Sequence, residues 1–131
     1  MIGIDTNVIV RYIVADDDAQ TRRAVAFVDS QVTPENPGFI SVAVLAELVW
    51  VLERSYRLSA VEINETIELL LCADALVIAN EPEVVSAMNE VWEGRGVFTD
   101  ALIGALNTSA GCSQTVTFDL KATRMSAFKV L

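Results

Sequence analysis

Short apolar runs alternate with longer helix-forming segments along the whole chain, and this alternation constrains the fold more than any other feature. The expected strands are residues 1–4, 38–40, 75–79, 115–118 and 128–131. The segments between them carry apolar residues at helical spacing. Strands that alternate with helices form βαβ units, whose sheet is mostly parallel and covered by helices on both faces. The sequence therefore predicts an α/β fold with a central, mostly parallel sheet of about five short strands flanked by helices.

Capping residues predict where several helices begin and end. Ser41 is expected to cap a helix that runs to about residue 56, and Ser59 with Glu62 forms a capping box for a helix to about residue 72. Two further helices are expected to begin near Asn80 and Thr99. No stretch has the composition of a linker, so we expect a single domain over residues 1–131.

Composition excludes several kinds of chemistry. The sequence contains no histidine, which excludes Ser-His triads, histidine general bases and histidine-ligated zinc. Its net charge of −9 disfavours a binding module that attaches to nucleic acid only by neutralising phosphate charges. Cys72 and Cys112 stand singly among apolar residues, so we expect two reduced core cysteines. Any chemistry must come from carboxylates, alone or with a hard cation.

The sequence carries no signal for a membrane or for secretion. The longest apolar stretch, residues 39–52, contains Ser41 and Glu47, and it is shorter than the roughly 20 residues of a membrane span. No basic region precedes the first apolar run, as a secretory signal would require. We therefore expect a soluble cytoplasmic protein that does not associate with membranes.

Four acidic residues are candidates for a functional site: Asp5, Glu47, Asp100 and Asp119. Ligands of open parallel sheets bind beyond the carboxyl ends of the strands, and Asp5 and Asp119 directly follow two expected strands. Each of the three aspartates has a structural alternative as a helix cap. Glu47 lies in a helix that is apolar on every side, so we expect it to be mostly buried. Two structural alternatives are open for Glu47. It forms a buried salt bridge with a basic residue, or its side chain points into a gap that is open to solvent.

Four segments resemble the four motifs of the PIN domain, in the same order. They are Asp-Thr-Asn-Val at 5–8, Ala-Glu-Leu-Val-Trp-Val-Leu at 46–52, Phe-Thr-Asp-Ala-Leu-Ile at 98–103 and Thr-Phe-Asp at 117–119. Over its whole length the chain more closely resembles the VapC-type toxins of bacterial toxin–antitoxin pairs. The resemblance implies a metal-dependent ribonuclease and a PIN domain spanning residues 1–131. It places the acidic cluster at Asp5, Glu47, Asp100 and Asp119, with supporting side chains at Thr6, Asn7 and Thr117.

One departure from the family pattern concerns the metal site. Many relatives carry an additional Asp three residues before the acid matched by Asp100, and here that position is Val97. Converging carboxylates repel one another unless a cation lies among them, and Mg²⁺ or Mn²⁺ prefers such oxygen ligands. We expect Asp5 and Asp100 to bind the metal directly, with Glu47 and Asp119 as ligands or water-mediated partners.

Two arginines and two tryptophans are candidates for holding RNA. Arg11 and Arg54 are expected to meet a phosphate or, alternatively, to form ordinary surface ion pairs. Trp50 and Trp92 can stack on bases, although a place in the core or in a dimer interface is the stronger expectation.

The four carboxylates and the family resemblance together predict an endoribonuclease that hydrolyses RNA phosphodiester bonds with Mg²⁺ or Mn²⁺, and the resemblance implies that it is the toxin of a type II toxin–antitoxin pair. Its expected partners are RNA, a cognate antitoxin protein and a second copy of the chain, because 53% hydrophobic residues are hard to cover in one small domain. The alternative is a catalytically weak or inactive PIN-fold interaction module, which Val97 keeps open. A dehalogenase-like phosphatase or a receiver domain is disfavoured, because Asn7 and Asn80 stand where those folds need Asp.

Overall fold

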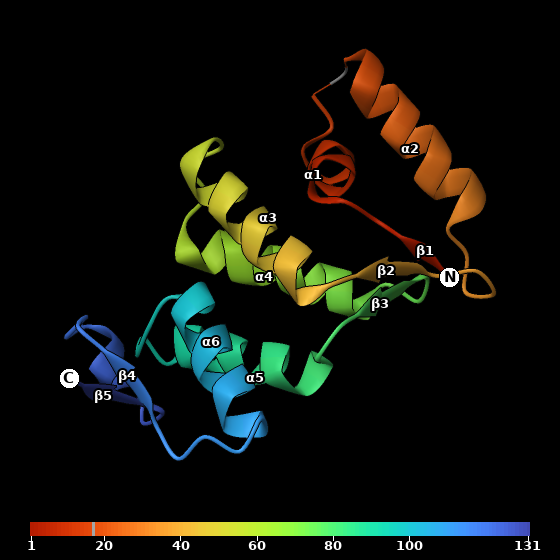
Figure 1. Ribbon diagram of the computed structural model, residues 1–131. Helices are drawn as coiled ribbons and strands as arrows, with labels where there is room; N and C mark the ends of the chain where they lie inside the picture. The colour runs from red at the N-terminus through yellow and green to blue at the C-terminus, as the bar shows by residue number, and fades with distance from the viewer. Residues whose placement is uncertain (17) are drawn as a thin grey trace. The chain divides into compact units, whose positions relative to one another are not determined.

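The computed structural model describes residues 1–16 and 18–131 and shows short strands alternating with helices along these ranges (Figure 1). The elements are β1 (Ile2–Gly3), α1 (Thr6–Val14), α2 (Ala19–Gln31), β2 (Gly38–Ile40), α3 (Val42–Arg54), α4 (Ala60–Cys72), β3 (Leu76–Ile78), α5 (Glu81–Trp92), α6 (Phe98–Ser109), β4 (Thr115–Thr117), the 3₁₀ helix η1 (Ala122–Arg124) and β5 (Phe128–Val130). The predicted α/β class is confirmed. Contacts divide the described chain into a first unit, Met1–Leu58 with Thr66–Ala79, and a second unit, Ser59–Glu65 with Asn80–Leu131.

The first unit is built on a parallel sheet with the strand order β1-β2-β3. Parallel neighbours need long crossover connections, and α1 with α2 supplies the first of these crossovers. Gly38 of β2 lies opposite Ile2 on one side and Leu76 on the other. A Cβ atom at Gly38 would lie 2.5 Å from Cδ1 of Ile4, so glycine allows β2 to pack this closely. The end of β2 leads directly into α3, which carries Glu47.

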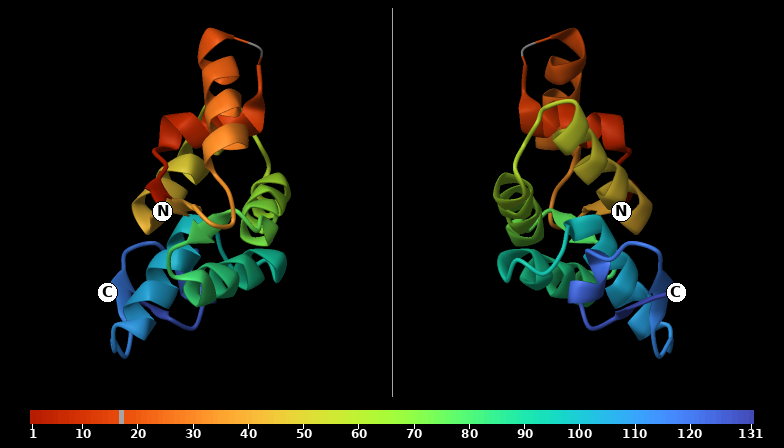
Figure 2. Two further views of the ribbon diagram at one scale, coloured as in Figure 1. Left: turned by 90° about the vertical axis from the view of Figure 1, so that its right-hand side faces the viewer. Right: turned by 90° about the vertical axis from the view of Figure 1, so that its left-hand side faces the viewer.

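The second unit contains a parallel pair, β4 and β5, in which Thr115 lies opposite Phe128. Among the described residues, the strands are thus hydrogen-bonded as one sheet of three and one sheet of two, each with parallel pairing. Helices α5 and α6 pack against each other (Figure 2). Helix α6 also approaches β5 at Gly104, where a Cβ atom would lie 2.8 Å from Cε2 of Phe128.

Each unit has its own apolar core. That of the first unit includes Ile9, Ile40, Leu45, Leu48, Leu52 and Ile67, and that of the second includes Val84, Ala87, Phe98, Leu102 and Met125. The polar residues Thr6, Thr21 and Asn64 are also buried. Nδ2 of Asn64 donates to the carbonyl of Met88 at 3.0 Å, which ties the start of α4 to α5. Among the described residues, no helix has the length and apolarity needed to cross a membrane.

The structure corrects the expected burial of four residues. Cys72 and Cys112 are both exposed rather than in the core, because one ends α4 and the other lies just beyond α6. Trp50 and Trp92 are 56% and 46% exposed, so neither is a core residue. Apolar neighbours in sequence predict a helix, but they do not determine which of its faces is covered. A dimer contact by either tryptophan stays a prediction.

Candidate active site

Asp5 lies where β1 gives way to α1, as expected for an acid at the end of a parallel strand. It is the N-cap of α1, and its Oδ1 accepts a hydrogen bond from the backbone N–H of Thr6 at 2.9 Å. The capping alternative is therefore correct for this oxygen. In the part of the chain that the structure describes, Oδ2 accepts no hydrogen bond, so this oxygen is available to a ligand.

Glu47 is exposed on α3, and the expectation that it is mostly buried is wrong. The buried side chains of α3 are Leu45, Leu48, Val49 and Leu52. The opposite side of the helix is a narrow stripe of exposed residues, Ala43, Glu47, Trp50 and Arg54. Because Ala43 and Trp50 are apolar residues, the sequence pattern did not indicate that this side of the helix is exposed. Glu47 therefore matches the solvent-facing alternative.

Thr6 holds Glu47 in place near Asp5. Its side chain is buried, and its hydroxyl donates to Oε2 of Glu47 at 2.9 Å. Asp5 and Glu47 line a common cavity of about 250 Å³ together with Thr6 and Asn7, and we call it the acidic cavity. The structure thus brings two of the predicted acids together with two of the predicted supporting residues.

Asp100 and Asp119 form a second pair of acids. Asp100 lies in the first turn of α6, where burial raises the pKa of its carboxyl and the negative charge of Asp119 raises it further. The capping alternative is wrong for Asp100, because the N-cap position of α6 belongs to Val97. Val97 forms no side-chain cap, so the departure from the family pattern also leaves this helix start without a side-chain acceptor.

Asp119 follows β4 and is fixed by two hydrogen bonds, one made by its backbone and one by its carboxylate. Its backbone N–H donates to Oγ1 of Thr117 at 3.0 Å. Its Oδ1 accepts from the backbone N–H of Lys121 at 2.9 Å. The predicted supporting residue Thr117 therefore lies directly beside the acid that it was expected to support.

Comparison with known protein families identifies the fold family. Residues 2–127 match the PIN domain family. This chain belongs to the PIN domain family. PIN domains are typically nucleases, and they generally use divalent metal ions. None of the curated proteins matches the sequence.

The ligands that this PIN domain offers suit a hard divalent cation. Asp5 and Glu47 belong to the first unit, and Asp100 and Asp119 belong to the second. Across residues 1–16 and 18–131, no three His, Cys, Asp or Glu side chains are grouped so that they could hold a metal ion. Within a unit, the candidate donors are therefore two carboxylates and hydroxyl oxygens. Oxygen donors of this kind fit Mg²⁺ or Mn²⁺ and do not favour zinc.

The two arginines predicted to contact RNA lie in different surroundings. Nη1 of Arg11 is 3.1 Å from Oδ2 of Asp18 and 3.5 Å from Oδ2 of Asp16. The ion-pair alternative therefore describes Arg11, which also lines the acidic cavity. The guanidinium of Arg54 lies 5.5 Å from the ring centroid of Trp50, at the end of the stripe that holds Glu47.

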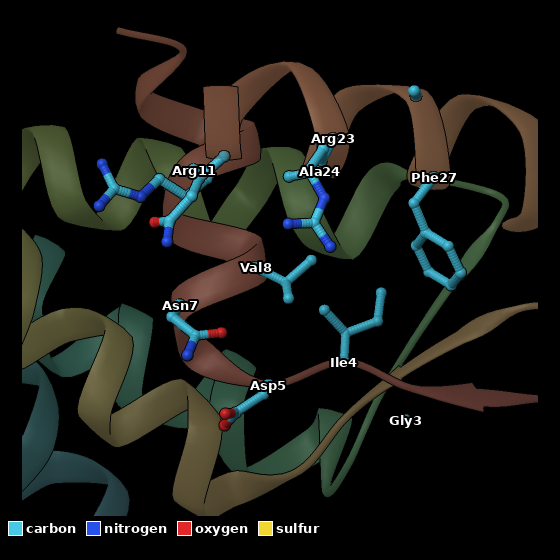
Figure 3. Close-up of a pocket in the computed structure, with 11 residues that line it drawn as sticks. Gly3, Ile4, Asp5, Asn7, Val8, Arg11, Arg23, Ala24 and Phe27 are labelled. Atoms are coloured by element: carbon cyan, nitrogen blue, oxygen red, sulfur yellow. The ribbon is translucent and has the colours of Figure 1, made fainter. Parts of the chain in front are cut away.

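Several residues near the acids were missed by the sequence reasoning. Ser55 and Tyr56 line the acidic cavity beside Glu47, although both follow the last residue of α3. Arg23 and Phe27 of α2 line a larger cavity that also contains Asp5 and Asn7 (Figure 3). The four-residue spacing of Arg23 and Phe27 placed them on one helix face. Nothing in the sequence indicated that this face looks toward Asp5.

Proposed function

We propose that this PIN domain is an endoribonuclease that uses Mg²⁺ or Mn²⁺, with Asp5, Glu47, Asp100 and Asp119 as its four catalytic carboxylates. The observation that carries the proposal is the pairing of Asp100 with Asp119. Asp100 is half-buried, and its burial together with the negative charge of the exposed Asp119 raises the pKa of its carboxyl. Such arrangements cluster at functional sites, and a divalent cation would relieve the repulsion.

The polar neighbours of the acids support the same proposal. Thr6 fixes one carboxylate oxygen of Glu47, and Thr117 fixes the backbone of Asp119. Within residues 1–16 and 18–131, Asp5 and Glu47 form no ion pair with a basic side chain, so their carboxylates are held by Thr6 alone. When bound, the cation would lower the pKa of a water molecule and stabilise negative charge on the phosphoryl oxygens. The chain has no histidine to act as a general base, so the proposed hydrolysis relies on carboxylates and metal.

The deciding experiment is incubation of the purified protein with total RNA and with tRNA. We expect cleavage in Mg²⁺ or Mn²⁺, and we expect excess chelator to abolish it. Asp100→Asn should lower cleavage by orders of magnitude, whereas Glu68→Gln, at an exposed position of α4, is the matched control that should cleave normally. Undiminished cleavage in chelator would overturn the proposal.

We also propose that the enzyme is the VapC-type toxin of a type II toxin–antitoxin pair. A cognate antitoxin would then insert an arginine among the carboxylates, because a guanidinium pairs with two carboxylate oxygens and competes with the metal. Co-expression with such a partner should suppress cleavage. Copurification of a small partner that leaves cleavage unchanged would contradict this role.

A homodimer is the remaining partner proposal. Large apolar side chains on the described surface, such as Leu69 and Phe118 at 73% and 81% exposed, support a further interface. Light scattering at micromolar concentration should give twice the mass of the chain, and a monomer mass would contradict the dimer.

Val97 favours one alternative function, a PIN fold retained for binding without efficient catalysis. Many relatives carry an acid three residues before the position of Asp100, whereas this chain has Val97 there. The missing carboxylate would weaken the metal site. Calorimetric titration with Mg²⁺ and Mn²⁺ separates the two functions. Metal binding that is lost in Asp100→Asn supports the nuclease, and absence of binding supports the interaction module.

A further inference from the structure

The larger cavity of the first unit, about 740 Å³, lies between α1 and α2. In Figure 3, Ile4 and Val8 form one side of it, and the side chains of Arg23 and Phe27 extend toward them from α2. Asp5 and Asn7 lie at one end of the cavity and also line the smaller acidic cavity. The volume falls within the roughly 300–1,000 Å³ that small-molecule sites occupy.

Arg23 and Phe27 offer this cavity two groups that are free to bind. Phe27 is 39% exposed although it is an aromatic residue. Within residues 1–16 and 18–131, the exposed guanidinium of Arg23 forms no hydrogen bond or ion pair. Arg11, in contrast, is held by Asp16 and Asp18. The cavity therefore combines an accessible ring with one available positive charge.

The spacing of the two side chains matches the parts of a nucleotide. Arg23 and Phe27 are four residues apart on α2, which separates their backbones by about 6 Å along the helix axis on the same face. An aromatic ring stacks on a base, and a guanidinium forms paired hydrogen bonds with a phosphate. An apolar peptide would instead leave Arg23 and Asn7 without partners once they are covered, which costs free energy.

We propose that this cavity binds one nucleotide of a single-stranded RNA, beside the nucleotide whose phosphodiester bond is cleaved. The base packs between Phe27 and the apolar side formed by Ile4 and Val8, and the phosphate binds Arg23. This subsite rests on the proposed ribonuclease function, because Asp5 joins it to the acidic cavity. The base must be unpaired to enter, so the preferred substrate is an RNA loop or single strand.

The test is the binding of a fluorescein-labelled, mixed-sequence single-stranded RNA of about eight nucleotides to the full-length protein, measured in chelator so that binding is separated from cleavage. Phe27→Ala should weaken binding about tenfold, the loss expected for one stacked base. It should leave the salt dependence unchanged, and Phe27→Trp should retain affinity. Arg23→Gln should weaken binding and also reduce the slope of log K against log salt by about 0.7, the value for one phosphate contact to a single strand.

Two control variants remove comparable side chains that do not line the cavity. Arg22→Gln removes the neighbouring charge on α2, and Val61→Ala removes an exposed apolar side chain of α4. Both should bind the RNA like the wild type and keep its salt slope. The same RNA annealed to its complement should bind equally to wild type and Phe27→Ala.

The outcomes separate this subsite from the nuclease function. If the wild type cleaves RNA but Phe27→Ala and Arg23→Gln both bind RNA like the wild type, the proposed subsite is wrong and the nuclease function stands. That outcome would favour a protein as the ligand of the cavity. If the variants lose binding while the wild type cleaves nothing, the subsite stands and the nuclease function fails. A wild type that binds no single-stranded RNA overturns the subsite.

Discussion

The hydrogen bond from Thr6 to Glu47 connects residues far apart in the sequence and is a sensitive point for testing the site. Thr6→Val keeps the shape of the side chain, which is only 4% exposed, and removes the donor 2.9 Å from Oε2 of Glu47. A hydrogen bond to a charged group contributes about 1.5–3 kcal/mol. Because Glu47 is exposed, water replaces the lost donor, so we expect a loss of about 1 kcal/mol. For a chain of 131 residues this lowers Tm by about 4 °C.

The effect on cleavage should be larger than the effect on stability. Groups that orient metal ligands typically change activity or metal affinity by about 10–100-fold when they are removed. We therefore expect Thr6→Val to reduce metal-dependent RNA cleavage by that factor. Thr6→Ser keeps the hydroxyl and should recover most of the activity.

Thr21→Val is the matched control. Thr21 is also 4% exposed in the same unit, and its hydroxyl donates to Oδ1 of Asp16 at 2.8 Å. Its loss should lower Tm by a similar amount and leave cleavage unchanged. Thermal melts and cleavage rates of the three variants test the reasoning together. Equal losses of activity in Thr6→Val and Thr21→Val would refute a specific role for the bond to Glu47.

Four further variants probe two of the acids and the position of Val97. Asp100→Asn should stabilise the protein in chelator at neutral pH, because the ionised carboxyl is desolvated and faces Asp119. A raised pKa in the folded state means that the carboxyl contributes most to stability when it is protonated, and this contribution is lost as pH rises through the raised pKa. Melts at a series of pH values should therefore show the advantage of Asp100→Asn vanishing below the ordinary Asp value of 3.8, and an advantage that persists there would contradict the assignment. Glu47→Gln should change Tm by only a few degrees, since its oxygen still accepts from Thr6, while RNA cleavage falls by orders of magnitude; a Tm loss above about 10 °C would instead indicate a structural role for the charge. Val97→Asn should stabilise the start of α6 by about 1 kcal/mol as a helix cap. Of the two substitutions, only Val97→Asp should tighten metal binding in calorimetry, and equal affinities of Val97→Asp and Val97→Asn would argue against an acid site there.

Local sequence patterns were sufficient to predict the capped helix starts and the acids at strand ends. Ser41 and the Ser59–Glu62 capping box lie where expected, with their predicted hydrogen bonds. Asp5 follows β1, and Asp119 follows β4. These features depend on residues close together in the chain, so their physical causes are visible in the sequence.

The environment of each acid depended on contacts between distant segments. Glu47 is exposed because the packing of α3 leaves uncovered the stripe that contains Ala43 and Trp50, two residues that resemble core residues by type alone. The partner of Glu47, Thr6, is 41 positions away, and no local pattern indicates such a pair. The raised pKa of Asp100 likewise arises from burial and from Asp119, which β4 brings near the start of α6.

Residue types therefore determined which chemistry this chain offers, namely oxygen ligands without histidine. Tertiary packing decided which of those oxygens meet, because strand pairing and helix packing bring together groups that the sequence separates by tens of residues. The same packing placed Arg23 and Phe27 of α2 over the cavity that begins at Asp5. A helical repeat specifies that two side chains share a face, but only the neighbouring elements determine what that face meets.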